Sequence, residues 1–399
     1  MGAQAKEKEN LRKGIEISIA MAEAAGQADV DVVAAYPITP QTHIVEHLSE
    51  LVADGDLDAE FVPVESEHSA MSCCCGSAAS GARTYTATAS QGLALMHEIL
   101  YIASGMRLPI VMAVANRALS APISIWNDHG DVMAERDTGW IQVFVENGQE
   151  AYDMTFHAFR VAEDANVLLP YMLNFDGFIM SHVIEPIHYW PEEKIREFLP
   201  PYTPQQRLDV DNPITMGPVG IPEIYLETRK VHHEVLRESK NTIIKAWDEM
   251  AKITGRQYHP VESYKCDDAE VRLLTMGSIS ETAMTAIDTM REKGVKVGLH
   301  RLRLWRPFPF DELKEALKGC KALGIVDRCL STGGPGGPVA SEIKSALFNE
   351  PSAPKVVEFI AGIGGRDVRV ETFEEMAQKV RKVHEGAEIP PFELVGVRE

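Results

Sequence analysis

Short apolar runs alternate regularly with longer segments along this chain, and this alternation constrains the fold more than any other sequence feature. Runs such as 29–35 and 108–115 are rich in Val, Ile, Met and Ala, as expected for strands buried on both faces. The segments between such runs have the length of helices. Strands alternating with helices indicate βαβ units and a mostly parallel sheet, so we expect an α/β fold.

The alternation occurs in two blocks separated by a proline-rich middle. In the first block we expect helices over 11–25, 41–53, 67–80, 93–104 and 150–163, and strands over 29–35, 60–64, 83–89, 108–115, 141–145 and 167–172. In the second block we expect helices over 281–293, 311–318, 339–348 and 372–383, and strands over 271–276, 295–302, 321–326 and 355–360.

The middle of the chain is irregular at first and then strongly helical. Residues 186–222 are dense in proline and indicate an extended connecting segment, whereas 223–254 have the pattern of one long helix. We place the domain boundary near 255–267. The expected domains are therefore 1–260, which includes the connecting segment, and 268–399.

Charge and patterning exclude several classes of function. The 399 residues carry a formal net charge of −20, which disfavours nucleic acid and anionic membrane surfaces as partners. The N-terminal segment is charged and lacks the apolar core of a secretory signal, and no apolar run approaches the roughly 20 residues of a membrane span. We expect a cytoplasmic protein.

The cysteines and common catalytic motifs point to no metal site in this chain. Its six cysteines include the triplet at 73–75 but no C-x-x-C pair, and we expect them to be buried apolar residues. No H-E-x-x-H, G-x-S-x-G or P-loop motif is complete. The glycine loops at 333–337 and 362–365 fit tight turns, or backbone N–H groups turned toward an anion.

Three loops that follow predicted strands carry polar residues in unusual settings. Thr39 lies between two prolines, where its hydroxyl could face a ligand or cap the next helix. Glu67 opens a helix of small residues, where it could act chemically or only favour the helix dipole. Arg117 follows an apolar strand and could hold a carboxylate, or pair with an acid at 128, 131 or 135.

The motifs that contain these loops resemble the alpha subunits of the 2-oxoacid:ferredoxin oxidoreductase family, and in particular pyruvate:ferredoxin oxidoreductase. The similar stretches run nearly end to end and include AYPITPQTHIVEHL, VESEHSAMS, ARTYTATASQGLALMHE, NFDGFIMSH, LRLWRPFPFDEL, STGGPGG and GIGGRD. The resemblance implies a doubly wound sheet of the thiamine-diphosphate-binding type, in its pyrimidine half. A smaller α/β domain similar to the transketolase C-terminal domain would follow it.

The same resemblance implies residue roles. Thr39 matches a threonine that contacts substrate, Arg117 the arginine that binds the substrate carboxylate, and Glu67 the glutamate facing the cofactor aminopyrimidine. A carboxylate bonded to that ring favours the tautomer that can accept the thiazolium proton. Cofactor binding is further expected at Pro37, Ile38, Ser90 and Gly92.

Cofactors and partners follow from the resemblance as well. It implies thiamine pyrophosphate with Mg²⁺, shared with a beta subunit because no G-D-G…N motif is present here, and [4Fe-4S] clusters only on partner subunits. Beta, gamma and delta subunits, ferredoxin, pyruvate and coenzyme A are the expected partners. Thr39 favours pyruvate over oxalate, while branched-chain and aryl 2-oxoacids, a non-catalytic scaffold and a transketolase-type transferase stay open.

Overall fold

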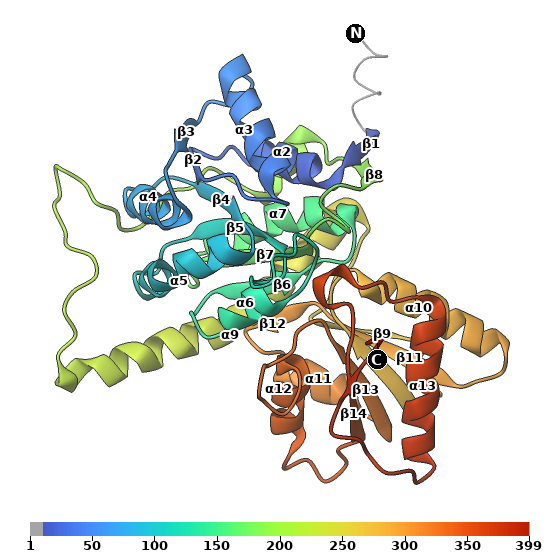
Figure 1. Ribbon diagram of the computed structural model, residues 1–399. Coiled ribbons are helices and arrows are strands. Elements are labelled where there is room, and N and C mark those ends of the chain that lie inside the picture. The colour runs from blue at the N-terminus through green and yellow to red at the C-terminus, as the bar shows by residue number, and fades with distance from the viewer. Residues whose placement is uncertain (1–10, 399) are drawn as a thin grey trace.

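The computed structural model describes residues 11–398 (Figure 1). Most of the charged N-terminal segment, on which the expectation of no secretory signal depends, lies outside the described residues. Within residues 11–398, no helix combines the length and the apolar character needed to cross a membrane.

The first part of the chain builds a seven-stranded sheet. Its strand order is β12-β6-β7-β5-β4-β2-β3, and every neighbouring pair is parallel except β12 with β6. The strands are β2 (Val32–Ala35), β3 (Glu60–Pro63), β4 (Thr84–Thr88), β5 (Ile110–Asn116), β6 (Ile141–Phe144), β7 (Tyr171–Asp176) and β12 (Leu304–Arg306).

Helices cover both faces of this sheet, which explains why its strands are apolar throughout. In β5, Val111, Ala113 and Ala115 join one core cluster, whereas Met112 and Val114 join the other. The first face carries α2 (Ile17–Gln27), α3 (Thr42–Asp54), α7 (Gly148–Ala162) and α9 (Pro222–Thr254), and the second carries α4 (Glu67–Ala79), α5 (Ser90–Gly105) and α6 (Gly130–Ala134).

The C-terminal part builds a second, six-stranded sheet below the first in Figure 1. Its order is β15-β14-β13-β10-β11-β9, with only β9 antiparallel to its neighbour. The elements are β9 (Val261–Tyr264), β10 (Val271–Thr275), α10 (Ile279–Glu292), β11 (Val297–Leu302), α11 (Phe310–Ala316), β13 (Ala322–Asp327), α12 (Pro338–Leu347), β14 (Lys355–Ile360), α13 (Val370–His384) and β15 (Glu393–Leu394).

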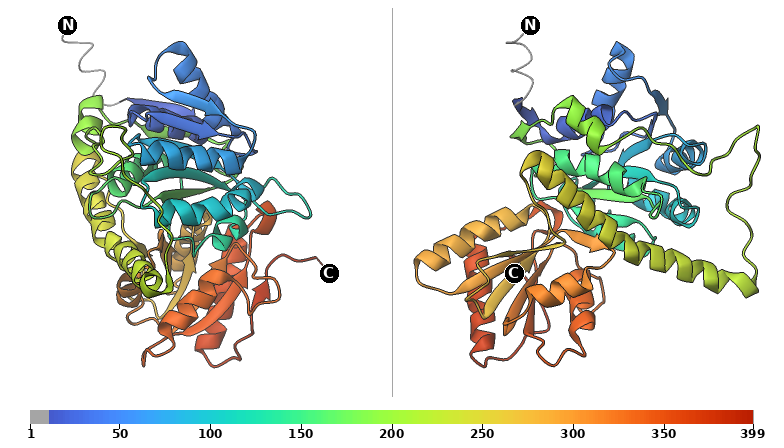
Figure 2. Two further views of the ribbon diagram at one scale, coloured as in Figure 1. Left: turned by 90° about the vertical axis from the view of Figure 1, so that its left-hand side faces the viewer. Right: turned by 180° about the vertical axis from the view of Figure 1, so that it is seen from behind.

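The two sheets share one core cluster, and the C-terminal part of the chain contributes one strand to the first sheet. The cluster between α4, α5 and the first sheet continues through Trp305 into the α11 and α12 face of the second sheet. Strand β12 follows β11 after a single residue, yet it pairs with β6 of the first sheet. Helix α9 runs along the back of the first sheet, and its N-terminal turns project from the body (Figure 2).

Most predicted elements are present, but the helix predicted over 11–25 is wrong in its first part. Residues 12–16 form β1 (Arg12–Glu16), which pairs antiparallel with β8 (Ile184–His188), and the helix begins only at Ile17. Gly14 is a poor helix former, and long-range pairing with β8 outweighs the local helical pattern.

Two further predictions need correction. The strand predicted over 167–172 begins only at Tyr171, because Leu168 has a φ of 43° and Pro170 precedes the strand. The segment 186–222 is not wholly extended, since it contains the helix α8 (Glu192–Phe198). The prediction of buried cysteines is confirmed for five of the six and is wrong for Cys73, which is half-buried; all six thiols are free.

Candidate active site

The predicted site residues lie at the carboxyl ends of four adjacent strands. In the order β5-β4-β2-β3, Arg117 follows β5, Ser90 follows β4, Thr39 follows β2 and Glu67 follows β3. Parallel strands bring their carboxyl ends to the same edge of a sheet, which is where open α/β sheets bind ligands. The topology therefore gathers loops from four separate parts of the sequence.

Arg117 is 5% exposed, and its guanidinium bonds only to uncharged acceptors. Nη1 donates to the Thr39 carbonyl at 2.7 Å, Nε to the Ser124 carbonyl at 3.1 Å, and Nη2 to Gln91 Oε1 at 3.2 Å. Burial lowers the pKa of the guanidinium from its usual value, although the charge of Asp131 acts in the opposite direction. A nearly buried cation held in this way is oriented to receive an anion.

The alternative prediction of an ion pair with a downstream acid is wrong. No carboxylate among residues 11–398 lies within 4.0 Å of the Arg117 guanidinium. Asp131 instead accepts a hydrogen bond from the Arg117 backbone N–H, at 3.0 Å. Glu135 pairs with His97, and Asp128 accepts from the Gly130 N–H.

Thr39 contacts Arg117 through its backbone rather than through its hydroxyl. Its carbonyl accepts from Arg117 Nη1, and the residue is exposed. The helix-capping alternative is wrong, because α3 begins at Thr42 and its N-cap is Gln41. The exposed hydroxyl beside Arg117 is thus available to a ligand.

Glu67 and Gly92 meet across the start of two helices. A Cβ on Gly92 would lie 2.6 Å from Glu67 Oε1 and 2.5 Å from Thr88 Oγ1, so only glycine leaves room there. Glu67 is 6% exposed, and no protein group in the described part of the chain hydrogen-bonds its carboxylate. Thr88 Oγ1 is buried without a partner. Buried polar groups without partners are uncommon and mark a place where a ligand can bond.

Residues 90–92 connect the surroundings of Arg117 to those of Glu67. Ser90 Oγ lies 2.7 Å from both Gln91 Oε1 and the Ala118 carbonyl, and its single proton can be donated to either, while Gln91 accepts from Arg117. Gly92 faces Glu67. Of the remaining predicted residues, Pro37 is exposed and Ile38 is half-buried against the first core cluster.

Sequence reasoning missed three residues of this site: Thr88, Gln91 and Asp131. Gln91 sits inside the stretch ARTYTATASQGLALMHE, between Ser90 and Gly92, so its position was available as a signal. Asp131 was considered only as an ion-pair partner, and nothing in its local sequence indicates that it accepts backbone N–H groups. Thr88 is one of several alternating threonines of β4 and carries no distinguishing signal.

The two glycine loops use backbone N–H groups within the protein. Asp327 accepts from the N–H groups of Val339 and Ala340, both at 3.0 Å, and Glu358 accepts from Gly337. The N-terminus of α12 is therefore occupied by the protein's own carboxylates. In the second loop, the Gly365 N–H donates to the Asn127 carbonyl at 2.9 Å. In the first loop the Gly334 N–H also donates to the Ser331 carbonyl at 2.8 Å, so this loop both makes a tight turn and faces N–H groups toward anionic side chains.

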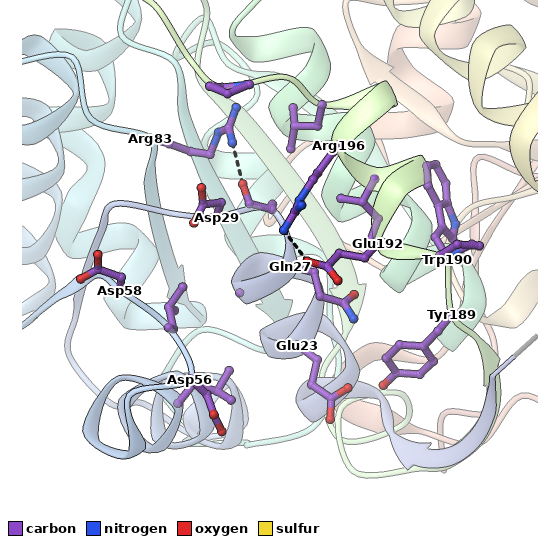
Figure 3. Close-up of a pocket in the computed structure, with 18 of the residues that line it drawn as sticks. Glu23, Gln27, Asp29, Asp56, Asp58, Arg83, Tyr189, Trp190, Glu192 and Arg196 are labelled. Atoms are coloured by element: carbon purple, nitrogen blue, oxygen red, sulfur yellow. Dashed lines mark hydrogen bonds and ion pairs between the residues drawn. The ribbon is translucent and has the colours of Figure 1, made fainter. Parts of the chain in front are cut away.

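A wide hollow between α2, the end of α3 and α8 lies apart from these loops (Figure 3). Its two arginines are already paired, Arg83 with Glu163 at 2.7 Å and Arg196 with Glu192 at 2.5 Å. None of the predicted site residues lines it. Its other charged side chains are acidic and disfavour an anionic ligand: Glu23, Asp29, Asp56 and Asp58.

No group of three or more His, Cys, Asp or Glu side chains is arranged to hold a metal ion within residues 11–398. The cofactor that the sequence resemblance implies can be tested against the side chains at the loop cluster. Glu67, whose carboxylate has no protein partner in the described part of the chain, and the unpartnered Thr88 hydroxyl lie together over Gly92, and this pair fits a polar heterocycle that offers hydrogen bonds.

Comparison with known proteins identifies matches over most of the chain. Residues 23–248 match the family described as pyruvate flavodoxin/ferredoxin oxidoreductase, thiamine diphosphate-binding, and 269–373 match pyruvate:ferredoxin oxidoreductase core domain II. The pyruvate synthase subunit PorA of Methanocaldococcus jannaschii is 50% identical over 95% of this chain and 96% of its own length. That of Pyrococcus furiosus is 48% identical over 97% and 98%.

More distant relatives extend the comparison. The ketoisovalerate oxidoreductase subunit VorA of Pyrococcus horikoshii is 42% identical over 95% of this chain and 96% of its own. A solved 2-oxoglutarate:ferredoxin oxidoreductase from Magnetococcus marinus aligns with a TM-score of 0.68 at 17% identity, over 93% of this chain and 65% of that one. A split-gene transketolase aligns at 0.55 and 12% identity, over 93% and 100%. These two structures show a shared fold.

Proposed function

The chain belongs to the pyruvate:ferredoxin oxidoreductase family, and from that premise we propose that its loop cluster is one half of a thiamine pyrophosphate site that acts on pyruvate. It is the alpha-type subunit of this multi-subunit enzyme. The reaction converts pyruvate and coenzyme A to acetyl-CoA and CO₂, and two electrons pass to ferredoxin.

The observation that carries the proposal is the Arg117 guanidinium, nearly buried and bonded only to neutral acceptors. A 2-oxoacid brings a carboxylate, for which a fixed guanidinium provides charge and geometry together. Arg117 would hold the carboxylate that leaves as CO₂, and the exposed Thr39 hydroxyl would contact the remainder of the substrate. The neutral ligands of Arg117 leave its charge free for this role.

Glu67 provides the acid–base function in this proposal. Thiamine pyrophosphate, when bound, supplies the nucleophilic carbon and the electron sink that protein side chains lack. Glu67 Oε1 would share a proton with the aminopyrimidine ring, and Thr88 Oγ1 would offer a second polar contact. Gly92, Ser90, Pro37 and Ile38 would shape the space around that ring.

The remaining cofactors and partners belong to the proposal as well. We assign the Mg²⁺–pyrophosphate half of the site to a beta subunit, and the [4Fe-4S] clusters to beta, gamma or delta subunits that pass electrons to ferredoxin. The domains are proposed as 1–260 and 268–399, and the location as cytoplasmic. The chain alone would then be inactive.

The test is co-purification of the chain with its native partners, followed by assay of a 2-oxoacid panel with a viologen acceptor. We expect iron–sulfur clusters in the partners and the highest kcat/KM for pyruvate. Because a ketoisovalerate enzyme subunit is 42% identical, the panel includes branched-chain as well as aryl acids and oxalate. Partners without clusters would instead favour a transketolase-type transferase.

Arg117→Ala, in the same complex, tests whether the Arg117 guanidinium binds the substrate carboxylate. We expect kcat/KM for pyruvate to fall by more than tenfold, which corresponds to more than about 1.4 kcal/mol of transition-state stabilisation. Arg107→Ala is the matched control, because Arg107 also bonds to backbone carbonyls, at Val167 and Leu168, away from the loop cluster. Equal rates in both variants would support a scaffold role instead.

A further inference from the structure

Asp131 connects the turn after β4 to the turn after β5. Its Oδ2 accepts from the backbone N–H groups of Ser90 and Arg117, both at 3.0 Å. Its Oδ1 accepts from Asn116 Nδ2 at 3.1 Å and from the Val132 N–H at 2.7 Å. The residue is only 2% exposed, so these four donors are its environment.

The arrangement requires a carboxylate. All four partners are N–H donors, and an ionised carboxylate is the side chain that only accepts. An asparagine of the same shape would turn an NH₂ group toward donors at one of the two oxygens. Burial raises the pKa of Asp131 to about 6, while the surrounding donors favour the ionised form.

The contacts continue from Asp131 to the guanidinium that we assign to the substrate. Ser90 has a φ of 47°, a left-handed conformation that costs free energy for a residue with a side chain. Its N–H bond to Asp131 and its Oγ bond to Ala118 hold it there. Ser90 also orients Gln91, whose Oε1 accepts from Arg117 Nη2.

We propose that Asp131 is a positioning residue that fixes the backbone of Ser90 and Arg117, and thereby aims the Arg117 guanidinium at the substrate carboxylate. The second half of this statement rests on the proposed function. Asp131 itself touches neither substrate nor cofactor in this proposal.

The test compares Asp131→Asn with Asp327→Asn in the assembled complex. Asp327 is a matched control, because it is equally buried and also accepts two backbone N–H groups, but in the second sheet. For Asp131→Asn we expect the KM for pyruvate to rise at least tenfold while kcat falls less than threefold, since a misaimed guanidinium weakens substrate binding. For Asp327→Asn we expect KM within twofold of wild type.

Hydrogen–deuterium exchange provides a readout independent of activity. The Ser90 and Arg117 amides should exchange at least tenfold faster in Asp131→Asn than in wild type. In Asp327→Asn the exchange rates of these two amides should equal those of wild type. The proposal requires both effects. Unchanged exchange at these amides would overturn it, and so would a KM equal to that of the control.

Failure of the proposed function and failure of the variant to assemble can each be told apart from failure of this inference. If wild-type complex oxidises no 2-oxoacid, the proposed function fails, and the exchange experiment still decides whether Asp131 fixes both turns. If Asp131→Asn does not assemble, Asn116→Ala replaces it, because this variant removes the side-chain donor to Asp131 Oδ1, together with a longer bond to Asn174, and keeps the carboxylate. We then expect at least a threefold rise in KM, and an unchanged KM would overturn the proposal.

Discussion

At the scale of single residues, the site contains two neighbouring polar side chains that have no protein partner. Glu67 and Thr88 are buried or nearly so, yet their oxygens take no hydrogen bond within residues 11–398. Leaving a buried hydroxyl such as that of Thr88 unpaired costs about 1–3 kcal/mol, which a ligand that bonds to it would recover on binding. The free protein is therefore less stable because of this unpaired group, which lies where we propose that the cofactor binds.

Gly92→Ala is expected to block this place. The added Cβ would lie within 2.6 Å of both Glu67 Oε1 and Thr88 Oγ1, closer than any normal contact. We expect the KM for thiamine pyrophosphate to rise more than tenfold in the assembled complex, as measured by titration of the apoenzyme.

Gly105→Ala in the same helix is the control for this substitution. No atom lies within 4 Å of its added Cβ, so the change should leave the KM unaltered. It should also stabilise the protein slightly, since glycine costs roughly 0.5–1 kcal/mol relative to alanine in a helix. Similar KM values for both variants would contradict the assigned role of Gly92.

At the scale of elements, buried carboxylates at strand ends accept hydrogen bonds from the backbone N–H groups at helix starts. Asp327, at the end of β13, caps the first N–H groups of α12, and Glu358 accepts from the preceding loop. Burial and the charge of Glu358 raise the pKa of Asp327 to about 7, and Lys344 opposes this. The structure therefore predicts a pH dependence of stability in the second sheet.

The sign of that dependence follows from the raised pKa. Between about pH 4 and 7, folded Asp327 binds more protons than the unfolded chain, so its contribution to stability is largest in acid and is lost as pH rises through about 7. Asp327→Asn removes this contribution. In denaturant titrations, the unfolding free energy of wild type minus that of Asp327→Asn should be larger at pH 5 than at pH 7.5. A difference that does not change with pH would contradict the raised pKa of Asp327.

At the scale of the whole molecule, a buried charge network joins the two sheets. Asp176, at the end of β7, bonds to Arg328 at 2.7 Å, to His129 at 2.8 Å and to the Ser278 N–H at 2.8 Å. Burial would raise the pKa of Asp176, but Arg328 and His129 outweigh it and hold that pKa well below its usual range. The side chains of Asp176 and Arg328 are each 1% exposed and come from different sheets.

Removing one partner of this pair should be strongly destabilising. Arg328→Ala leaves the Asp176 charge buried and partly unpaired, and we expect a loss of about 3–5 kcal/mol in the free energy of unfolding. Arg196→Ala, in an exposed pair with Glu192, should cost less than about 1 kcal/mol. Denaturant titration of both variants checks this, and equal losses would show that the buried pair does not hold the sheets together.

How well the sequence predicts an element depends on how far apart in the chain its interacting residues lie. Strands buried on both faces, such as β5, and helices with long periodic patterns, such as α9, are encoded locally and were predicted within a few residues. The pairing of β1 with β8 depends on residues about 170 positions apart, so no local pattern could reveal it. Glu67, Thr39 and Arg117 were predictable because each follows a strand, whereas the bonds of Asp131 to two other loops exist only in three dimensions.

Strand β12 limits how the polypeptide can be divided. The proposed domain boundary lies before residue 268, but residues 304–306 complete the edge of the first sheet beyond that point. Cutting the gene at the boundary would leave β6 as an open edge, and such edges invite aggregation. A truncated first part would therefore need residues 304–306, or a substitute strand, to cover β6.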